Sequence, residues 1–226
     1  MQQNQIPGQV NNGFQIFKKE AESIQNEYPG LMLDTYAKNA TPSIAGVIQL
    51  EDEKGSFIDS YKLKIVTTTD YPNQFPHVFE TGGRIPINID WHVYPDDGHC
   101  CISSIPEEIL ICKNGISLNS FIENQLKPYL FNQKYREVHG FFLKERPHGN
   151  KGNIQFFIEV FQTNDLTTIV KWLIFIRQRN EPNRVSKCFC GSNQKYRKCH
   201  RETYRILSSF TNQELDYFID MISKFG

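Results

Sequence analysis

The stretch SIAGVIQLEDEKGSFIDSYKLKIV, residues 43–66, decides the fold. In its second half, apolar side chains alternate with polar ones, apart from Asp59 on the apolar side. The alternating apolar residues are Phe57, Tyr61, Leu63 and Ile65. Alternation with a period of two is typical of a half-buried strand. Turn residues separate the two halves from each other and from LMLDTYA (31–37), so the three runs predict an antiparallel meander.

Segments with apolar residues at helical spacing lie before and after this meander in the sequence. Apolar residues from Phe14 to Tyr28 recur every three or four positions, which predicts an amphipathic helix over 13–28 ended by YPG. The Pro- and aromatic-rich stretch 67–83 predicts a loop leading into an edge strand at 77–80. A further helix is predicted to begin near Ser117, with Pro128 bending or ending it.

The remainder of the chain is mostly helical by pattern. Residues 154–161 fit a helix, although an apolar run of that length also fits a strand, and 166–176 fit a helix more firmly. ERPHGNKGN (145–153) predicts a loop, and RQRNEPNRVSK (177–187) a linker. Thr211 and Glu214 form a capping box ahead of the last helix. We therefore expect an α+β domain over residues 1–180 and a small module over 181–226.

Composition excludes several classes of protein. Of 226 residues, 39% are hydrophobic and 13% aromatic, enough for a real core, and 25 Lys and Arg balance 25 Asp and Glu. The first twenty residues lack a basic start followed by an apolar run, so no signal peptide is expected. No run approaches the roughly 18 apolar residues of a membrane helix. These features predict a cytoplasmic protein that does not span a membrane.

Three of the six cysteines lie in CFCGSNQKYRKCH, residues 188–200. Four zinc-type ligands are present there: Cys188, Cys190, Cys199 and His200. The string C-x-C-G-S-x6-C-H resembles the SEC-C motif, a short zinc-binding appendage of many bacterial proteins. The resemblance implies zinc and a protein-binding surface, but no activity. Because four protein ligands would close the site, we expect the zinc to be structural.

The segment around this cluster is basic, with nine Lys or Arg against two Glu between Arg177 and Arg205. Basic segments bind nucleic acid, but they also bind acidic proteins or are simply solvated. Nucleic acid is therefore not the expected main partner.

The stretch HVYPDDGHCCISS, residues 92–104, carries two adjacent cysteines behind an acidic turn. A cysteine nucleophile needs exposure and groups that stabilise developing charge. The turn would present the following residues near a surface, and His92 and His99 could act as a base or a positive neighbour. In an extended segment successive side chains alternate faces, so Cys100 and Cys101 would point in opposite directions. Cys112, in an apolar run, is expected to be an inert core thiol.

The order of these elements resembles that of the ubiquitin-conjugating (UBC) enzyme fold, over roughly residues 10–175. In that family a Tyr- and Pro-rich loop follows the third strand, and a D-G-x-x-C-[LI] stretch carries the thioester-forming cysteine. Tyr71, Pro72, Phe75 and Pro76 match the loop. Asp97 and Gly98 match the turn, Cys101 the nucleophile and Ile102 the aliphatic position. By this resemblance Cys101 is the nucleophile, and Cys100 faces the core.

One family feature is missing from this chain. Eukaryotic members carry His-Pro-Asn upstream of the cysteine, and the asparagine is associated with stabilising the oxyanion. DWHVYPDDG (90–98) has no asparagine. His92 corresponds to the triplet histidine, and backbone amides, Tyr94 or His99 are candidates for the vacant role. An aspartate near the cysteine, Asp96, could position or deprotonate the incoming amine.

The resemblance implies a transferase that holds a protein C-terminus as a thioester on Cys101 and passes it to an amine. Bacterial relatives occur with ubiquitin-like proteins and activating enzymes, and in antiphage (CBASS) systems beside cGAS-like nucleotidyltransferases. The implied partners are therefore a cGAS-like nucleotidyltransferase or a ubiquitin-like protein as donor, an activating enzyme, and a protein carrying the target lysine. Two alternatives remain open: a catalytically silent UBC-fold binding module, and a cysteine hydrolase that uses Cys101 and a histidine.

Overall fold

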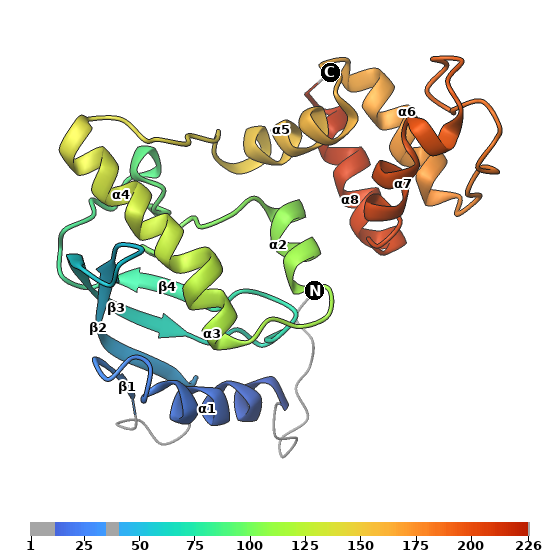
Figure 1. The fold of residues 1–226 in the computed structure, drawn as a ribbon. Helices are drawn as coiled ribbons and strands as arrows, with labels where there is room; N and C mark the ends of the chain where they lie inside the picture. The colour runs from blue at the N-terminus through green and yellow to red at the C-terminus, as the bar shows by residue number, and fades with distance from the viewer. Residues whose placement is uncertain (1–11, 35–40, 226) are drawn as a thin grey trace. The chain divides into compact units, whose positions relative to one another are not determined.

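The computed structural model describes residues 12–34 and 41–225 (Figure 1). Residues 35–37 of the strand expected at 31–37, and the start of the segment inspected for a signal peptide, lie outside the described residues. The chain divides into two compact units. Unit 1 takes in the residues up to Ser103 and Ile111–Glu145, and unit 2 takes in Ser104–Leu110 and the residues from Arg146 onward.

Unit 1 is built on a four-stranded antiparallel sheet in the order β1-β2-β3-β4. The strands are β1 (Leu31–Leu33), β2 (Ser43–Glu51), β3 (Phe57–Val66) and β4 (His77–Glu80). The expected meander and the expected edge strand at 77–80 are both confirmed. Helix α1 (Asn12–Ile24) precedes the sheet and buries Phe17, Ala21 and Ile24, three residues of the predicted apolar face.

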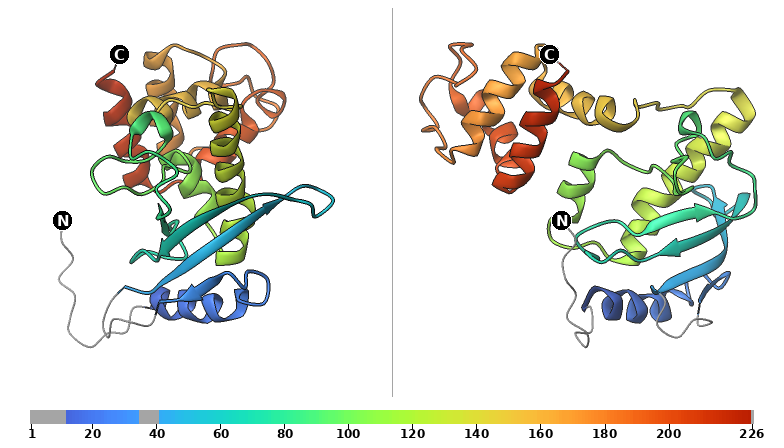
Figure 2. Two further views of the ribbon diagram at one scale, coloured as in Figure 1. Left: turned by 90° about the vertical axis from the view of Figure 1, so that its left-hand side faces the viewer. Right: turned by 180° about the vertical axis from the view of Figure 1, so that it is seen from behind.

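One face of the sheet is buried. Ile44 of β2 lies opposite Ile65 of β3, and Ile48 lies opposite Tyr61, and all four side chains belong to the core. A long helical segment crosses this sheet in Figure 1 and is seen from two further sides in Figure 2. The α+β class expected from the sequence is thus present in unit 1.

The helical segment has three parts: α3 (Leu118–Phe121), a π-helical turn η2 (Ile122–Leu126) and α4 (Lys127–His139). The segment begins after Ser117, close to the expected start, and the Ser117 side chain caps it by accepting a hydrogen bond from the backbone of Ser120. Of the two outcomes expected at Pro128, a bend or an end, the end is wrong, because the helix continues for eleven residues to His139. Pro128 lies in the first turn of α4, where a missing backbone N–H costs little. The π turn just before it is closed by a hydrogen bond from the Lys127 amide to the Ile122 carbonyl.

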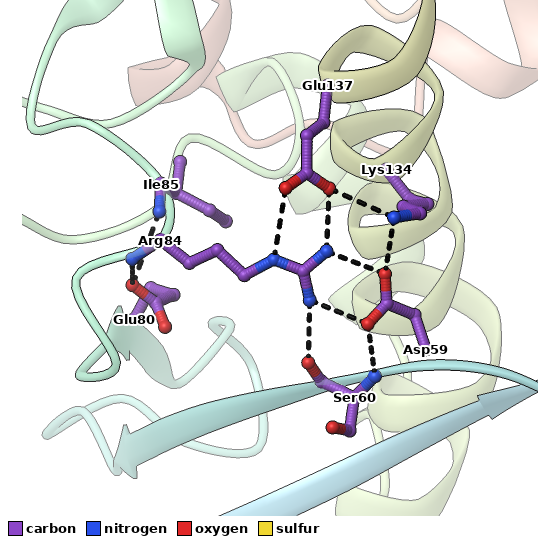
Figure 3. Close-up of polar contacts among 7 residues, drawn as sticks. All are labelled: Asp59, Ser60, Glu80, Arg84, Ile85, Lys134 and Glu137. Atoms are coloured by element: carbon purple, nitrogen blue, oxygen red, sulfur yellow. Dashed lines mark hydrogen bonds and ion pairs between the residues drawn. The ribbon is translucent and has the colours of Figure 1, made fainter.

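Asp59, the polar residue on the apolar side of β3, joins a cluster of four charges (Figure 3). The Arg84 guanidinium donates two hydrogen bonds to the Asp59 carboxylate, at 2.7 and 2.6 Å, and two to Glu137, at 3.4 and 2.6 Å. Lys134 of α4 lies 2.9 Å from Asp59. The Arg84 hydrogen bonds, together with Lys134, lower the pKa of Asp59 although burial opposes ionisation. The cluster holds α4 against β3 and so positions the face of α4 that carries Tyr129, Gln133 and Arg136.

Unit 2 is helical. It contains most of α2 (Ile105–Cys112), together with α5 (Gly149–Phe161), α6 (Leu166–Arg177), the 3-10 turn η3 (Tyr196–Lys198), α7 (Arg201–Leu207) and α8 (Asn212–Ser223). Residues 154–161 are therefore helical, and α5 begins inside the stretch expected to be a loop. The Thr211–Glu214 capping box is present at the start of α8.

The division between the units differs from the expected one at residue 180. Phe157 and Phe161 of α5 and Leu173 of α6 pack in one core with Tyr196 and Phe218. The apolar faces of α5 and α6 thus belong to the same core as the Cys/His segment. The stretch expected to be a linker also makes defined contacts, because Arg179 donates hydrogen bonds to the carbonyls of Ser208 and Phe210 at 2.6 Å.

Candidate functional site

The two adjacent cysteines end an irregular segment that folds back on itself. The Tyr94 amide donates to the His99 carbonyl at 2.9 Å, and the Gly98 amide donates to the Tyr94 carbonyl at 2.9 Å. Gly98 has φ 84°, a left-handed conformation that suits glycine. The Cys100 amide then bonds to the Val78 carbonyl of β4 at 2.7 Å, so the end of the segment is attached to the sheet edge.

Helix α4 holds the backbone that precedes the turn. Three side chains at helical spacing donate hydrogen bonds to three successive carbonyls. They are Tyr129 to His92 (3.0 Å), Gln133 to Trp91 (2.7 Å) and Arg136 to Asp90. Residues 129, 133 and 136 share one face of a helix, which is why they reach one stretch of chain. Since the Cys101 amide also donates to the His92 carbonyl at 2.7 Å, this face of α4 fixes the backbone on which Cys101 depends.

The two thiols have different environments. The Cys100 side chain points into the core and is 4% exposed, and burial raises the pKa of its thiol to about 11. Cys101 is partly exposed, and its Sγ lies 3.3 Å from the Tyr94 hydroxyl oxygen. A ring nitrogen of His92 lies within 4.8 Å of the same sulfur. Of the two cysteines, Cys101 is therefore the one that a reactant can reach.

His99 lies between Tyr94 and a histidine that the sequence did not single out. The rings of Tyr94 and His99 stack at 4.4 Å, and those of His99 and His77 stack at 4.5 Å with an interplanar angle of 10°. Nδ1 of His99 lies 2.5 Å from Oδ1 of Asp97. Burial opposes ionisation of Asp97, but its hydrogen bonds from the amide and the ring of His99 outweigh this and lower its pKa. Asp96, expected to handle the amine, is exposed on the same turn.

His77 joins this group because β4 pairs with the segment before Cys101. Phe79 and His99 form an isolated antiparallel bridge, which brings His77 diagonally across from His99 on the same face. Burial, followed by the nearby charge of His99, lowers the pKa of His77. The sequence did not indicate a role for His77, because His99, which it contacts in the structure, lies 22 positions further along the chain.

The Cys/His segment of unit 2 gathers all four expected ligand residues. Their ligand atoms lie within 4.8 Å of one another. Nδ1 of His200 lies 3.5 Å from Cys188 Sγ and 3.1 Å from Cys199 Sγ, and Cys190 Sγ lies 3.6 Å from Cys199 Sγ. Ligands at the bond lengths usual for zinc, arranged as a tetrahedron, are about 3.5–3.8 Å apart. The cluster can therefore hold one metal ion with small adjustments.

Local structure around the cluster suits a metal ligand set. Gly191, φ 81°, makes the turn after Cys190. Nε2 of His200 lies 3.5 Å from the Phe161 carbonyl, which can accept its proton and leave Nδ1 for a metal. Part of the basic flank is neutralised locally, since Glu181 lies 3.7 Å from Arg201 and 3.2 Å from Arg205. Cys112, at the end of α2, is buried, as expected of a core thiol.

Within the described residues, none of the helices has both the length and the hydropathy that a bilayer-spanning segment needs. No protein-family model matches the chain, and no curated protein or solved structure gives a significant match to it.

Proposed function

We propose that the protein is a ubiquitin-conjugating-enzyme-like transferase that carries an acyl group as a thioester on Cys101. The single observation that carries the proposal is the contrast between the two cysteines. The side chain of Cys100 is buried in the core, and the pKa of its thiol is raised. The side chain of Cys101 is partly exposed, and the Tyr94 hydroxyl lies 3.3 Å from its sulfur. The order of elements in unit 1 supports the same reading: a helix, a meander, a Tyr-Pro loop and a cysteine-bearing turn.

The reaction has two acyl transfers. The Cys101 thiolate attacks the activated C-terminal carbonyl of a donor protein, a carbon–sulfur bond forms, and the activating group leaves with its electron pair. An amine then attacks the thioester, the amine nitrogen loses a proton, and the thiolate leaves as an amide forms. Each step passes through an oxyanion that needs a hydrogen-bond donor.

Tyr94 is the side chain best placed to supply that donor. Its hydroxyl already contacts the sulfur to which the carbonyl carbon becomes bonded. Stacking on His99 holds the ring at 4.4 Å. We therefore assign to Tyr94 the role that the asparagine of the His-Pro-Asn triplet has in eukaryotic members. His99, oriented by Asp97 at 2.5 Å, is the nearby imidazole that could take the proton of the amine.

We propose zinc as the metal of the Cys/His cluster in a module of the SEC-C type. Three thiolates and one imidazole form a set that suits zinc. With four protein ligands the ion has no position left for a substrate, so it would stabilise the segment rather than take part in the reaction. Cys188, Cys190, Cys199 and His200 would hold it.

The donor that we propose is a protein C-terminus, that of a cGAS-like nucleotidyltransferase or of a ubiquitin-like protein, with an activating enzyme upstream and a lysine-bearing target. The setting would be antiphage defence in the bacterial cytoplasm. This assignment rests on the resemblance of ERPHGNKG (145–152), ahead of an aromatic-rich helix, to the bacterial members of the conjugating-enzyme family.

The test is intact-mass analysis under denaturing, non-reducing conditions of protein purified from cells that also express its genomic neighbours. Wild type, Cys100→Ala and Cys101→Ala are compared. A protein-sized adduct that thiol or hydroxylamine releases, and that only Cys101→Ala lacks, is expected. An adduct that persists in Cys101→Ala but disappears in Cys100→Ala would contradict the assignment.

A cysteine hydrolase is the second candidate, because a ring nitrogen of His92 lies within 4.8 Å of Cys101 Sγ. A hydrolase would turn the donor over to free carboxylate without accumulating a thioester. A silent binding module would yield neither the adduct nor the free carboxylate while keeping its fold.

A further inference from the structure

Three side chains capable of binding a metal meet at the edge of the sheet in unit 1, apart from the Cys/His cluster. They are His77, at the start of β4, and Asp97 and His99, on the turn before the cysteines. One ligand atom from each lies within 4.8 Å of the other two. The proposals for Cys101 and for the Cys/His cluster do not use His77.

Backbone structure, rather than chance proximity of mobile side chains, brings the three together. The bridge between Phe79 and His99 aligns the turn with β4. The left-handed Gly98 reverses the chain between Asp97 and His99, and Asp97 Oδ1 accepts a hydrogen bond from the His99 amide at 3.1 Å. The backbone that carries the three side chains is thus fixed before any ion binds.

The donor set has the chemistry of a transition-metal site. Two imidazoles and one carboxylate suit first-row divalent ions such as Zn²⁺, whereas Mg²⁺ and Ca²⁺ prefer oxygen ligands throughout. Metal binding needs neutral imidazole and an ionised carboxylate.

We propose that His77, Asp97 and His99 bind one divalent transition-metal ion of the Zn²⁺ class. Ligand atoms bonded to one such ion are about 3–4 Å apart, so rotations of the three side chains suffice to close the site. In the metal-bound form the ion takes the place of the proton between His99 and Asp97, whose atoms are 2.5 Å apart, so His99 is then a ligand and does not accept the proton of the amine. Asp97, with 49% of its side chain exposed, leaves room for water in the remaining coordination positions.

The stack brings the rings of His77 and His99 close to each other, but a metal ion lies in the plane of each imidazole that binds it, so one ring must turn out of the parallel arrangement when the ion binds. Here the rings stack at 4.5 Å while Asp97 orients one of them. A bound ion would fix the turn that carries Cys100 and Cys101 to β4.

The experiment is equilibrium dialysis of the full-length protein against buffered micromolar Zn²⁺, followed by elemental analysis and by calorimetric titration with Zn²⁺. Wild type is expected to bind one more zinc per chain than His77→Ala, His99→Ala or Asp97→Asn. Each of these substitutions should weaken the additional site at least 10-fold, the lower end of the effect of removing a group that supports a metal. Two controls, Asp96→Asn and His139→Ala, remove a neighbouring carboxylate and an exposed histidine of α4 and should bind zinc as wild type does.

Comparison between variants separates this site from the Cys/His cluster, because all of them keep the four residues of that cluster. The measurement does not depend on acyl transfer, so its result tests the metal site independently of the role proposed for Cys101. Equal zinc content in wild type, His77→Ala and His99→Ala would overturn the proposal. So would an equal loss in Asp96→Asn and Asp97→Asn, or loss of the additional zinc in Cys101→Ser. Circular dichroism melting checks that each variant is folded, and His77→Gln replaces His77→Ala if the latter is not.

Discussion

Replacing Tyr94 with Phe removes one hydroxyl beside the proposed nucleophile and leaves the aromatic ring in place. The hydroxyl oxygen lies 3.3 Å from Cys101 Sγ. The ring stacks on His99 at 4.4 Å, and phenylalanine can keep that contact. The substitution therefore tests the hydroxyl alone.

The size of the effect is worked from the hydrogen bond that the hydroxyl would donate to the oxyanion. A hydrogen bond to a charged group contributes about 1.5–3 kcal/mol. Because each 1.36 kcal/mol changes a rate tenfold, the thioester of Tyr94→Phe should react with amines about 10- to 150-fold more slowly. Stability should change by less than about 0.5 kcal/mol, because the structure shows the hydroxyl contacting a partly exposed sulfur rather than the core.

The assay is single-turnover aminolysis of the isolated thioester at saturating amine, followed by intact mass. Tyr135→Phe is the matched control, since the ring of Tyr135 also packs against a histidine, His139, at 4.2 Å in another part of unit 1. A wild-type rate for Tyr94→Phe would refute the role of the hydroxyl. If Tyr94→Ala were slow while Tyr94→Phe was normal, the ring rather than the hydroxyl would be the important group.

Three further predictions concern stability. Cys199→Ser should release the bound metal and lower the melting transition of unit 2 in calorimetry while that of unit 1 is kept; a single shared shift would contradict the two-unit division. Cys100→Ser should cost about 1–3 kcal/mol in denaturant unfolding by burying a hydroxyl, with little change in thioester yield, and the reverse would exchange the roles of the two cysteines. Arg84→Ala should lower the free energy of unfolding by about 1–3 kcal/mol, because it removes a partner of Asp59, which is only 16% exposed. Lys64→Ala breaks a more exposed ion pair and should lower it by less than about 1 kcal/mol. The pKa of Asp59 in the folded protein is lowered below its unfolded value of about 3.9. The ion pair therefore stabilises the protein above that pH, and this stabilisation is lost as the pH falls. In Arg84→Ala the free energy of unfolding should accordingly depend less on pH in the acid range.

Local patterns predicted the elements of the sheet and most helices. The alternation in β3, the spacing in α1 and the capping box of α8 each depend on residues close together in sequence. Pro128 was harder to interpret, because its effect depends on whether the preceding turn is regular, and the sequence does not show the π turn. The boundary between the units was also not readable. The apolar faces of α5 and α6 are visible in the sequence, but which core they join is a long-range property.

In the candidate site too, features set by residues close in sequence were predicted and those set by long-range contacts were not. Cys101 is the candidate that the resemblance at D-G-x-x-C indicates, and alternation of side chains then predicted Cys100 on the core side, where the structure has it. His77 was missed because strand pairing, not proximity in the chain, brings it to His99. The choice between Asp96 and Asp97 depends on the conformation of one turn, which puts Asp97 against His99.

The π turn between α3 and α4 keeps two helix faces in phase. In a regular α-helix Tyr129, eight residues after Phe121, would point about 80° away from it, whereas a turn that absorbs one extra residue reduces the difference to about 20°. Phe121 can then remain in the core while Tyr129 reaches the His92 carbonyl. Deleting one residue from 123–125 should therefore preserve both faces, provided that Pro128, which would then lie inside a regular helix, is replaced as well. The turn acts as a spacer that sets the angle at which α4 meets the cysteine-bearing segment.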